Sequence, residues 1–107
     1  MLHTVLAITF AIVVGQHSDR VRIYYPTEKN VTLLEVCIVT EGHGDPDKGE
    51  SSEPWYRQSC WPPPDRASEE YRLPQNTYWV MGLLRLVDEG QQFTLQTRPI
   101  RTRPEPR

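Results

Sequence analysis

Proline is the residue that most limits what this chain can fold into. Ten of its 107 residues are proline, and each removes a backbone N–H donor and breaks the interior of an α-helix. The prolines gather in Pro62-Pro63-Pro64 and in the C-terminal stretch RPIRTRPEPR, where extended or polyproline-like backbone is expected. This distribution argues against a helical bundle.

Short runs rich in β-branched and aromatic residues lie between turn signals, which is typical of strands. The runs expected to be strands are Arg20–Tyr25, Val31–Thr40, Trp55–Trp61, Thr77–Asp88 and Gln91–Thr97. About five strands of this kind predict an all-β fold, a small antiparallel β-sandwich or barrel-like domain.

Two of these runs raise a question about burial. Val31–Thr40 carries apolar residues on both faces, which predicts a central strand covered on both sides. Thr77–Asp88 has the same character; a helix is the alternative there, and Gly82 in the middle of the run favours the strand. The polar segment before it is ambiguous, with a single helical turn over Ala67–Arg72 as one interpretation.

The N-terminal residues resemble a leader more than a part of the fold. From Val5 to Val14 the chain is apolar apart from Thr9, and this length is typical of a signal-peptide core and too short to span a membrane. Small residues precede Gln16, so residues 1–15 are predicted to be a signal peptide cleaved after Gly15. The alternative is a short buried helix or strand of the fold.

Secretion decides how the only two cysteines, Cys37 and Cys60, are interpreted. In an oxidising compartment two cysteines of a small domain most often form a disulfide. They are too far apart for a Cys-x-x-Cys redox or zinc motif, and His43 between them is a single histidine in a polar loop. A disulfide that closes one loop of the domain is therefore expected.

The chain then divides into a leader, one domain and a tail. Residues 16–97 form the β domain, with an acidic loop at residues 41–54, and residues 98–107 form a Pro/Arg-rich disordered tail. The net charge of −2 gives no reason to expect nucleic acid as a partner. No second apolar run reaches membrane-spanning length.

The segment LVDEGQQFTL resembles the Asp-x-Gly-x-Tyr-x-Cys corner of immunoglobulin domains. Phe93 stands one position later than the tyrosine of that motif, and Leu95 stands near the place of its cysteine. The spacing of Cys37 and Cys60 is also too short for the disulfide that joins the two sheets of such domains. We assign no family on this segment.

Motifs that would indicate catalysis are missing from the sequence. There is no nucleophile elbow, no zinc-protease helix motif and no phosphate-binding glycine loop. Asp45–Glu50 has carboxylates two residues apart, as calcium loops do, but its glycine and closing residue stand at the wrong positions. We therefore expect a protein that is not an enzyme and that needs neither a metal nor a cofactor.

Two features predict functional positions at the surface, a glycosylation site and a binding surface. Asn30 begins the sequon Asn30-Val31-Thr32 at a predicted turn, where a glycan could be attached. Aromatic residues and arginine cluster around Cys60, and these residue types are enriched at binding hot spots. The candidate binding surface consists of Trp55, Tyr56, Arg57 and Trp61.

These observations predict a secreted, extracellular binding or effector protein that acts by contact with another protein or receptor. The alternative is a secreted precursor that releases a basic C-terminal peptide. The paired arginines Arg98 and Arg101 have the minimal spacing of a processing site for that alternative, although Pro99 lies between them.

Overall fold

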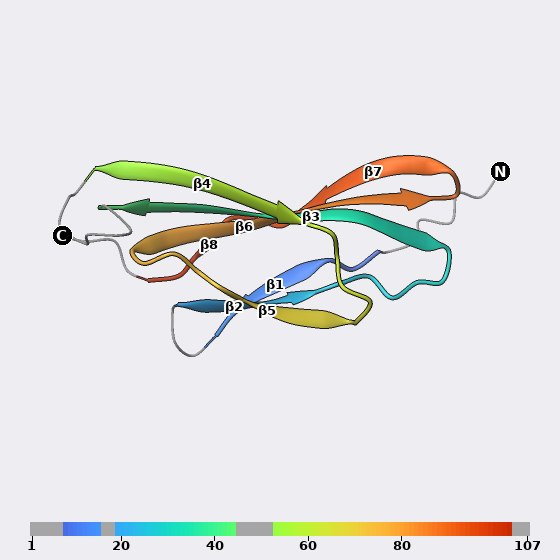
Figure 1. Ribbon diagram of the computed structural model, residues 1–107, viewed down its shortest axis with the longest axis horizontal. Helices are drawn as coiled ribbons and strands as arrows, with labels where there is room; N and C mark the ends of the chain where they lie inside the picture. The colour runs from blue at the N-terminus through green and yellow to red at the C-terminus, as the bar shows by residue number, and fades with distance from the viewer. Residues whose placement is uncertain (1–7, 16–18, 45–52, 104–107) are drawn as a thin grey trace.

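The computed structural model of the chain describes residues 8–15, 19–44 and 53–103, which form two antiparallel sheets (Figure 1). The small sheet has the order β1-β2-β5; the large sheet has the order β4-β3-β6-β7, and β8 also pairs with β6. The strands are β1 (Ala11–Val14), β2 (Arg20–Tyr24), β3 (Val31–His43), β4 (Pro54–Trp61), β5 (Ser68–Arg72), β6 (Thr77–Asp88), β7 (Gln91–Gln96) and β8 (Ile100–Arg101). The predicted all-β sandwich is confirmed.

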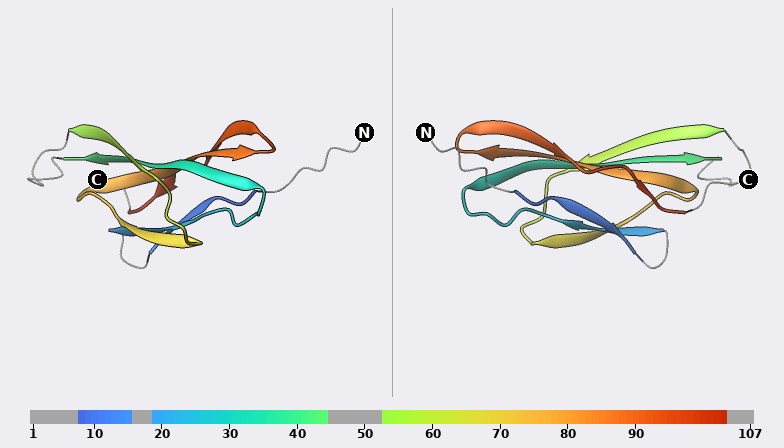
Figure 2. Two further views of the ribbon diagram at one scale, coloured as in Figure 1. Left: turned by 45° about the vertical axis from the view of Figure 1, so that its right-hand side comes forward. Right: turned by 180° about the vertical axis from the view of Figure 1, so that it is seen from behind.

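The two sheets differ in length as well as in strand number. The molecule measures 56 × 27 × 23 Å, and the large sheet runs along its whole length while the small sheet lies against its middle (Figures 1 and 2). One end of the large sheet is the β3–β4 hairpin and the other is the β6–β7 hairpin. At the latter, Glu89 and Gly90 both have positive φ, the geometry of a tight two-residue hairpin turn.

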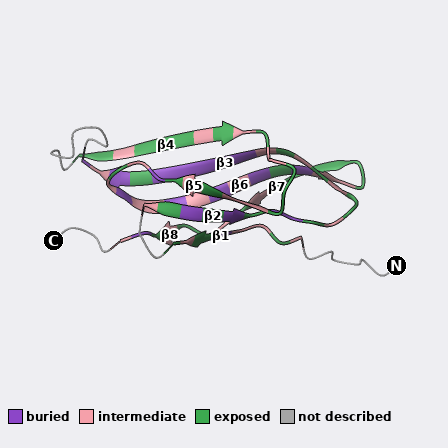
Figure 3. Cartoon of the chain, turned by 60° about the horizontal axis from the view of Figure 1, so that its bottom comes forward, coloured by how far each residue is buried: buried purple, intermediate pink, exposed green. Residues whose placement is uncertain are grey.

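The hydrophobic core draws on both sheets, and Figure 3 shows buried residues mainly on β2, β3 and β6. It draws alternate residues from the facing strands, because successive side chains of a strand point to opposite faces. Its buried members are Ile12, Val21, Ile23, Tyr25, Val36, Ile38, Leu73, Val80, Leu84 and Leu86. We call the face of the large sheet that packs on this core its inner face.

The outer face of the large sheet corrects one prediction. β3 is a central strand, flanked by β4 and β6, as expected. It is not covered on both sides, since no described element lies over its outer face (Figures 1 and 2). Cys37 and Val39 on that face are only 7% and 5% exposed because they sit in the middle of the sheet, between Cys60 and Leu83 and between Gln58 and Met81 respectively.

The apolar N-terminal run contributes a strand to the small sheet. β1 pairs with β2, Ile12 is 6% exposed in the core, and the ring of Phe10 lies against Gly82 on the inner face of β6. This arrangement matches the alternative of a short buried strand for residues 8–15. Cleavage after Gly15 stays a prediction.

The ambiguous segment after the triple proline is a strand, so the helical turn considered over Ala67–Arg72 is wrong. β5 pairs with β2 along its whole length. The Glu70 carboxylate lies 3.2 Å from Arg20 and 3.7 Å from Arg22. A polar segment with no strand signal of its own thus becomes a strand through its partner.

The beginning of the predicted tail is also ordered. β8 pairs with Trp79 and Val80 of β6, the Thr102 amide donates to the Tyr78 carbonyl at 2.9 Å, and the Thr102 hydroxyl donates to the Thr77 carbonyl at 2.5 Å. Residues 100–102 therefore extend the large sheet, within the segment that was expected to be disordered. Residues 104–107 lie outside the described residues.

The described strands have the order of a variable-type immunoglobulin sandwich without its C″ and D strands, with β4 in the place of C′ and β7 in the place of G. The likeness is one of strand order alone. The segment LVDEGQQFTL lies at the β6–β7 turn, whereas the tyrosine corner of that fold lies at the start of the strand corresponding to β6.

Candidate binding surface

The four residues of the predicted surface all lie on β4, an edge strand, and they divide between its two faces. Tyr56 is opposite Glu41 and points outward, 63% exposed. Trp55, Arg57 and Trp61 are opposite Gly42, Thr40 and Val36 on the inner face. Alternation along the strand therefore separates neighbours that the sequence places together.

Trp61 faces the small sheet and helps to hold the two sheets together. Its ring stacks on Tyr71 of β5 with centroids 5.1 Å apart, and its Nε1 donates to the Glu69 carboxylate at 2.7 Å. The Tyr25 hydroxyl donates to the same carboxylate oxygen. Burial, followed by the hydrogen bond to Glu69, raises the pKa of Tyr25 well above its usual range. This network links β4 and β5 with Tyr25, the residue that follows β2, so we assign Trp61 to the packing of the sandwich.

Trp55 lies nearer to the hairpin end, where its ring packs directly on the backbone of β3. A Cβ at Gly42 would overlap both the Trp55 indole and the Asn76 carbonyl, so a glycine is required for this approach. The Arg57 guanidinium lies 5.9 Å from the centroid of the indole ring. Trp55 Nε1 is buried and has no hydrogen-bond partner among the described residues.

A hollow of about 440 Å³ lies at this end of the sheet and brings Trp55 and Tyr56 together with residues of β3 and β6. It is lined by Glu41, Gly42, His43, Pro54, Trp55, Tyr56 and Trp79. We call Trp55, Tyr56, Arg57 and His43 the hairpin-tip surface; Tyr56 and Arg57 are exposed, whereas Trp55 and His43 are half-buried. Residues 45–52, which include the acidic centre of the predicted 41–54 loop and the whole candidate calcium segment Asp45–Glu50, lie outside the described residues.

Several residues near this end were not part of the predicted binding surface. Arg101 lies 4.9 Å from the Trp79 ring centroid, Arg103 lies 5.4 Å from the Tyr78 ring centroid, and His43 meets Tyr78 edge to face at 5.4 Å. The stretch Tyr78-Trp79 was the available signal, but it was interpreted as part of a strand covered on both sides. The arginines lie in the segment that was expected to be a disordered tail.

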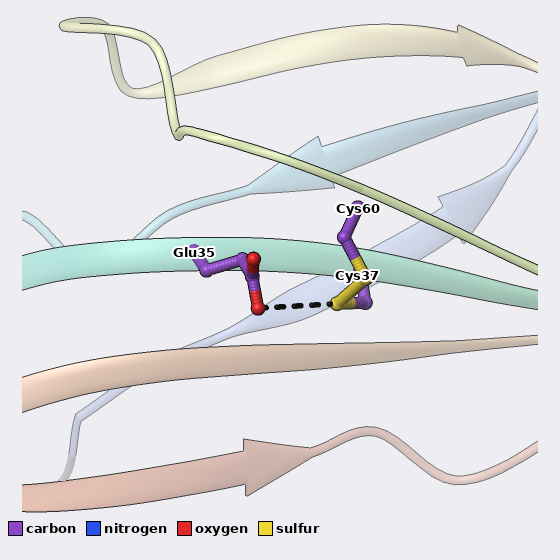
Figure 4. Close-up of side chains that lie close together, drawn as sticks. All are labelled: Glu35, Cys37 and Cys60. Atoms are coloured by element: carbon purple, nitrogen blue, oxygen red, sulfur yellow. Dashed lines mark hydrogen bonds between the residues drawn. A yellow bond between two sulfur atoms is a disulfide. The ribbon is translucent and has the colours of Figure 1, made fainter.

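The predicted disulfide between Cys37 and Cys60 is confirmed, and it joins directly paired residues of β3 and β4 on the outer face. Glu35 Oε1 lies 3.8 Å from Cys37 Sγ (Figure 4). Glu35, Cys37 and Cys60 have ligand-type atoms within 4.8 Å of one another. With both sulfurs oxidised, however, the group offers no thiolate to a metal.

Asn30 lies in the turn before β3, and both Asn30 and Thr32 of the sequon are exposed. The position is therefore open to a glycan, and occupancy stays a prediction.

Comparison with known proteins adds no relative to these observations: no family model, no curated protein and no solved structure matches the chain. Among the described residues, no helix has the length and apolar character needed to cross a membrane.

Proposed function

We propose that this chain is a secreted extracellular protein without catalytic activity that acts by contact with another protein through its hairpin-tip surface. The observation that carries the proposal is Tyr56, whose side chain is 63% exposed on an edge strand beside a hollow lined by two tryptophans. A large exposed aromatic ring supplies contact area at low conformational cost, which is why aromatic residues are enriched at binding hot spots.

The disulfide supports this proposal at the level of the scaffold. It joins β3 to β4 four residues from Tyr56 and limits how far the edge strand can separate from the sheet. A surface held in one conformation loses less entropy on binding than a mobile one. A disulfide in a domain of this size also agrees with an oxidising, extracellular setting.

The alternative of a precursor that releases its C-terminal residues gains no support from the arrangement of residues 98–103. Cleavage after Arg101 would remove Thr102, whose amide and hydroxyl both bond to β6. A protease would have to detach β8 from the sheet before it could reach this bond.

Capture from extracellular fluid tests the proposal, with the wild-type chain and two variants as baits. Tyr56→Ala should reduce capture of a specific partner at least tenfold, the usual size of a hot-spot effect. Tyr24→Ala is the matched control, because Tyr24 is 42% exposed on the small sheet, away from the tip. Equal capture by all three baits would contradict the proposed surface, and mass spectrometry of the secreted product would show whether the tail is released.

A further inference from the structure

The outer face of the large sheet carries a row in which an acid, an aromatic ring and a base occupy neighbouring strands. Glu41 on β3 is paired with Trp79 on β6, and Trp79 is paired in turn with Arg101 on β8. The Arg101 guanidinium lies over the Trp79 ring at 4.9 Å. Read across the sheet, the row changes from negative to positive charge, with Trp79 at its centre.

A groove of about 550 Å³ lies along β6 beside this row. Val39, Trp79 and Met81 give it an apolar floor, Glu41 stands on the β3 side, and Arg98 stands on the opposite side. Among the described residues, neither the Glu41 carboxylate nor the Arg98 guanidinium forms an ion pair. The groove thus has opposite charges on its two walls.

The chain itself keeps this groove open. The Thr97 amide donates a hydrogen bond to the Gly82 carbonyl of β6 at 2.9 Å. Strand pairing with β6 resumes only at Ile100, which lies opposite Val80. Arg98 and Pro99 lie in the interruption, where Pro99 has no N–H to donate. Arg98 and Pro99, between β7 and β8, therefore line the groove without pairing to β6.

Such a face is complementary to itself in one orientation. A two-fold axis that runs along β6, between two facing sheets, places β3 of each copy over β7 and β8 of the other. Glu41 of one copy then faces Arg98 and Arg101 of the second, and the apolar β6 residues of both copies meet in the middle. An axis across the strands would instead place Glu41 against Glu41.

We propose that the partner of this face is a second copy of the chain, in a two-fold dimer whose axis runs along β6. The proposal goes beyond the hairpin-tip function and does not depend on it. Because the axis is parallel to the strands, both hairpin tips point to the same end of the dimer. Opposite charges across the interface fix this orientation and disfavour the alternative one.

The test is the mass of the full chain in solution, measured by light scattering and by sedimentation. The wild type should be a dimer. Glu41→Arg should be a monomer, because like charges then face each other at two symmetry-related places, and Arg98→Glu/Arg101→Glu should be a monomer for the same reason. A one-to-one mixture of the two variants should recover the dimer mass, since each then presents the charge that the other needs.

Two further variants keep the result interpretable. Arg72→Glu, on the small sheet, makes a similar charge change away from the face and should leave the dimer intact. Glu41→Gln keeps the side-chain volume, so the variant should fold. It should raise the dissociation constant of the dimer about tenfold, because the two-fold symmetry removes the charge attraction at two places in the interface. A monomeric wild type, a dimer that survives both charge reversals, or folded variants that stay monomeric when mixed would each overturn the proposal.

Discussion

Tyr25 and Tyr56 show at the scale of single residues that position decides what an aromatic side chain does. Tyr25 is 4% exposed and donates its hydroxyl to Glu69 in the core, whereas Tyr56 is 63% exposed on the edge strand. The same contrast divides Trp61, which packs between the sheets, from the residues of the hairpin-tip surface. Stability and binding should therefore respond to different aromatic residues.

Replacing Trp61 should cost stability, and replacing Tyr56 should not. Trp61→Ala removes the stack on Tyr71 and one hydrogen bond to Glu69, and we expect a loss of about 3 kcal/mol in the free energy of unfolding. Tyr56→Ala, the control on the same strand, should change it by less than about 0.5 kcal/mol. Urea denaturation measures both values, and a small effect of Trp61→Ala would exclude it from the packing of the sandwich.

The raised pKa of Tyr25 predicts a loss of stability in alkali. The folded state keeps the phenol protonated where the unfolded chain ionises, so the stabilisation is complete below about pH 10 and is lost as the pH rises above it. The advantage of the wild type over Tyr25→Phe should then shrink by at most about 1.4 kcal/mol per pH unit. Tyr24→Phe, at an exposed neighbour, serves as the control, and a constant difference from Tyr25→Phe would contradict the prediction.

Among the strands, β1 most needs an experimental test, because its residues fit both a cleaved signal peptide and a core strand. Ile12→Ala should cost about 2–4 kcal/mol of unfolding free energy if β1 belongs to the native sandwich. Val13→Ala, at a position 51% exposed, should cost little. Equal and small effects in the full chain would show that β1 does not pack as described.

N-terminal sequencing of the secreted product addresses the leader directly. A product that begins at Gln16 would lack β1 and Phe10. The edge of β2 would then have no strand partner on that side, and Gly82 would lose its contact with the Phe10 ring. We then expect it to unfold at a lower urea concentration than the chain that retains residues 8–15.

The disulfide acts at the same scale, on the β3–β4 hairpin. Reduction, or replacement of Cys37 and Cys60 by alanine together, should lower the unfolding free energy by about 3 kcal/mol, as expected for a loop of this length. Intact mass with and without reductant should differ by the two hydrogens of one bridge. A covalent dimer that disappears on reduction would contradict the intrachain bond.

Because the large sheet is long, the sequon at Asn30 lies far from the hairpin-tip surface and from the groove on the outer face. Asn30 precedes β3 and the hairpin tip follows it, so the two ends are roughly 40 Å apart at the usual rise of a strand. Asn30→Gln should therefore remove any glycan, seen as a loss of mass, without changing partner capture or dimer mass. A change in either would place the glycan within a contact surface.

Most strands and the disulfide could be predicted from the sequence. Runs rich in β-branched and aromatic residues predicted β2, β3, β4, β6 and β7, and two cysteines after a predicted leader predicted their bond. Each strand signal lies within a few neighbouring residues, so no knowledge of remote partners was needed for the strands.

Features that depend on segments far apart in the chain could not be predicted from the sequence. Leu34 is the extra residue of a bulge, which turns Leu33 inward against Leu86 and leaves Leu34 37% exposed, although simple alternation grouped Leu34 with Val36. β5 and β8 exist because β2 and β6 offer free edges to pair with. Within the described part of the chain the outer face is open, because the small sheet packs on the inner face. A strand pattern cannot show how many layers will cover a sheet.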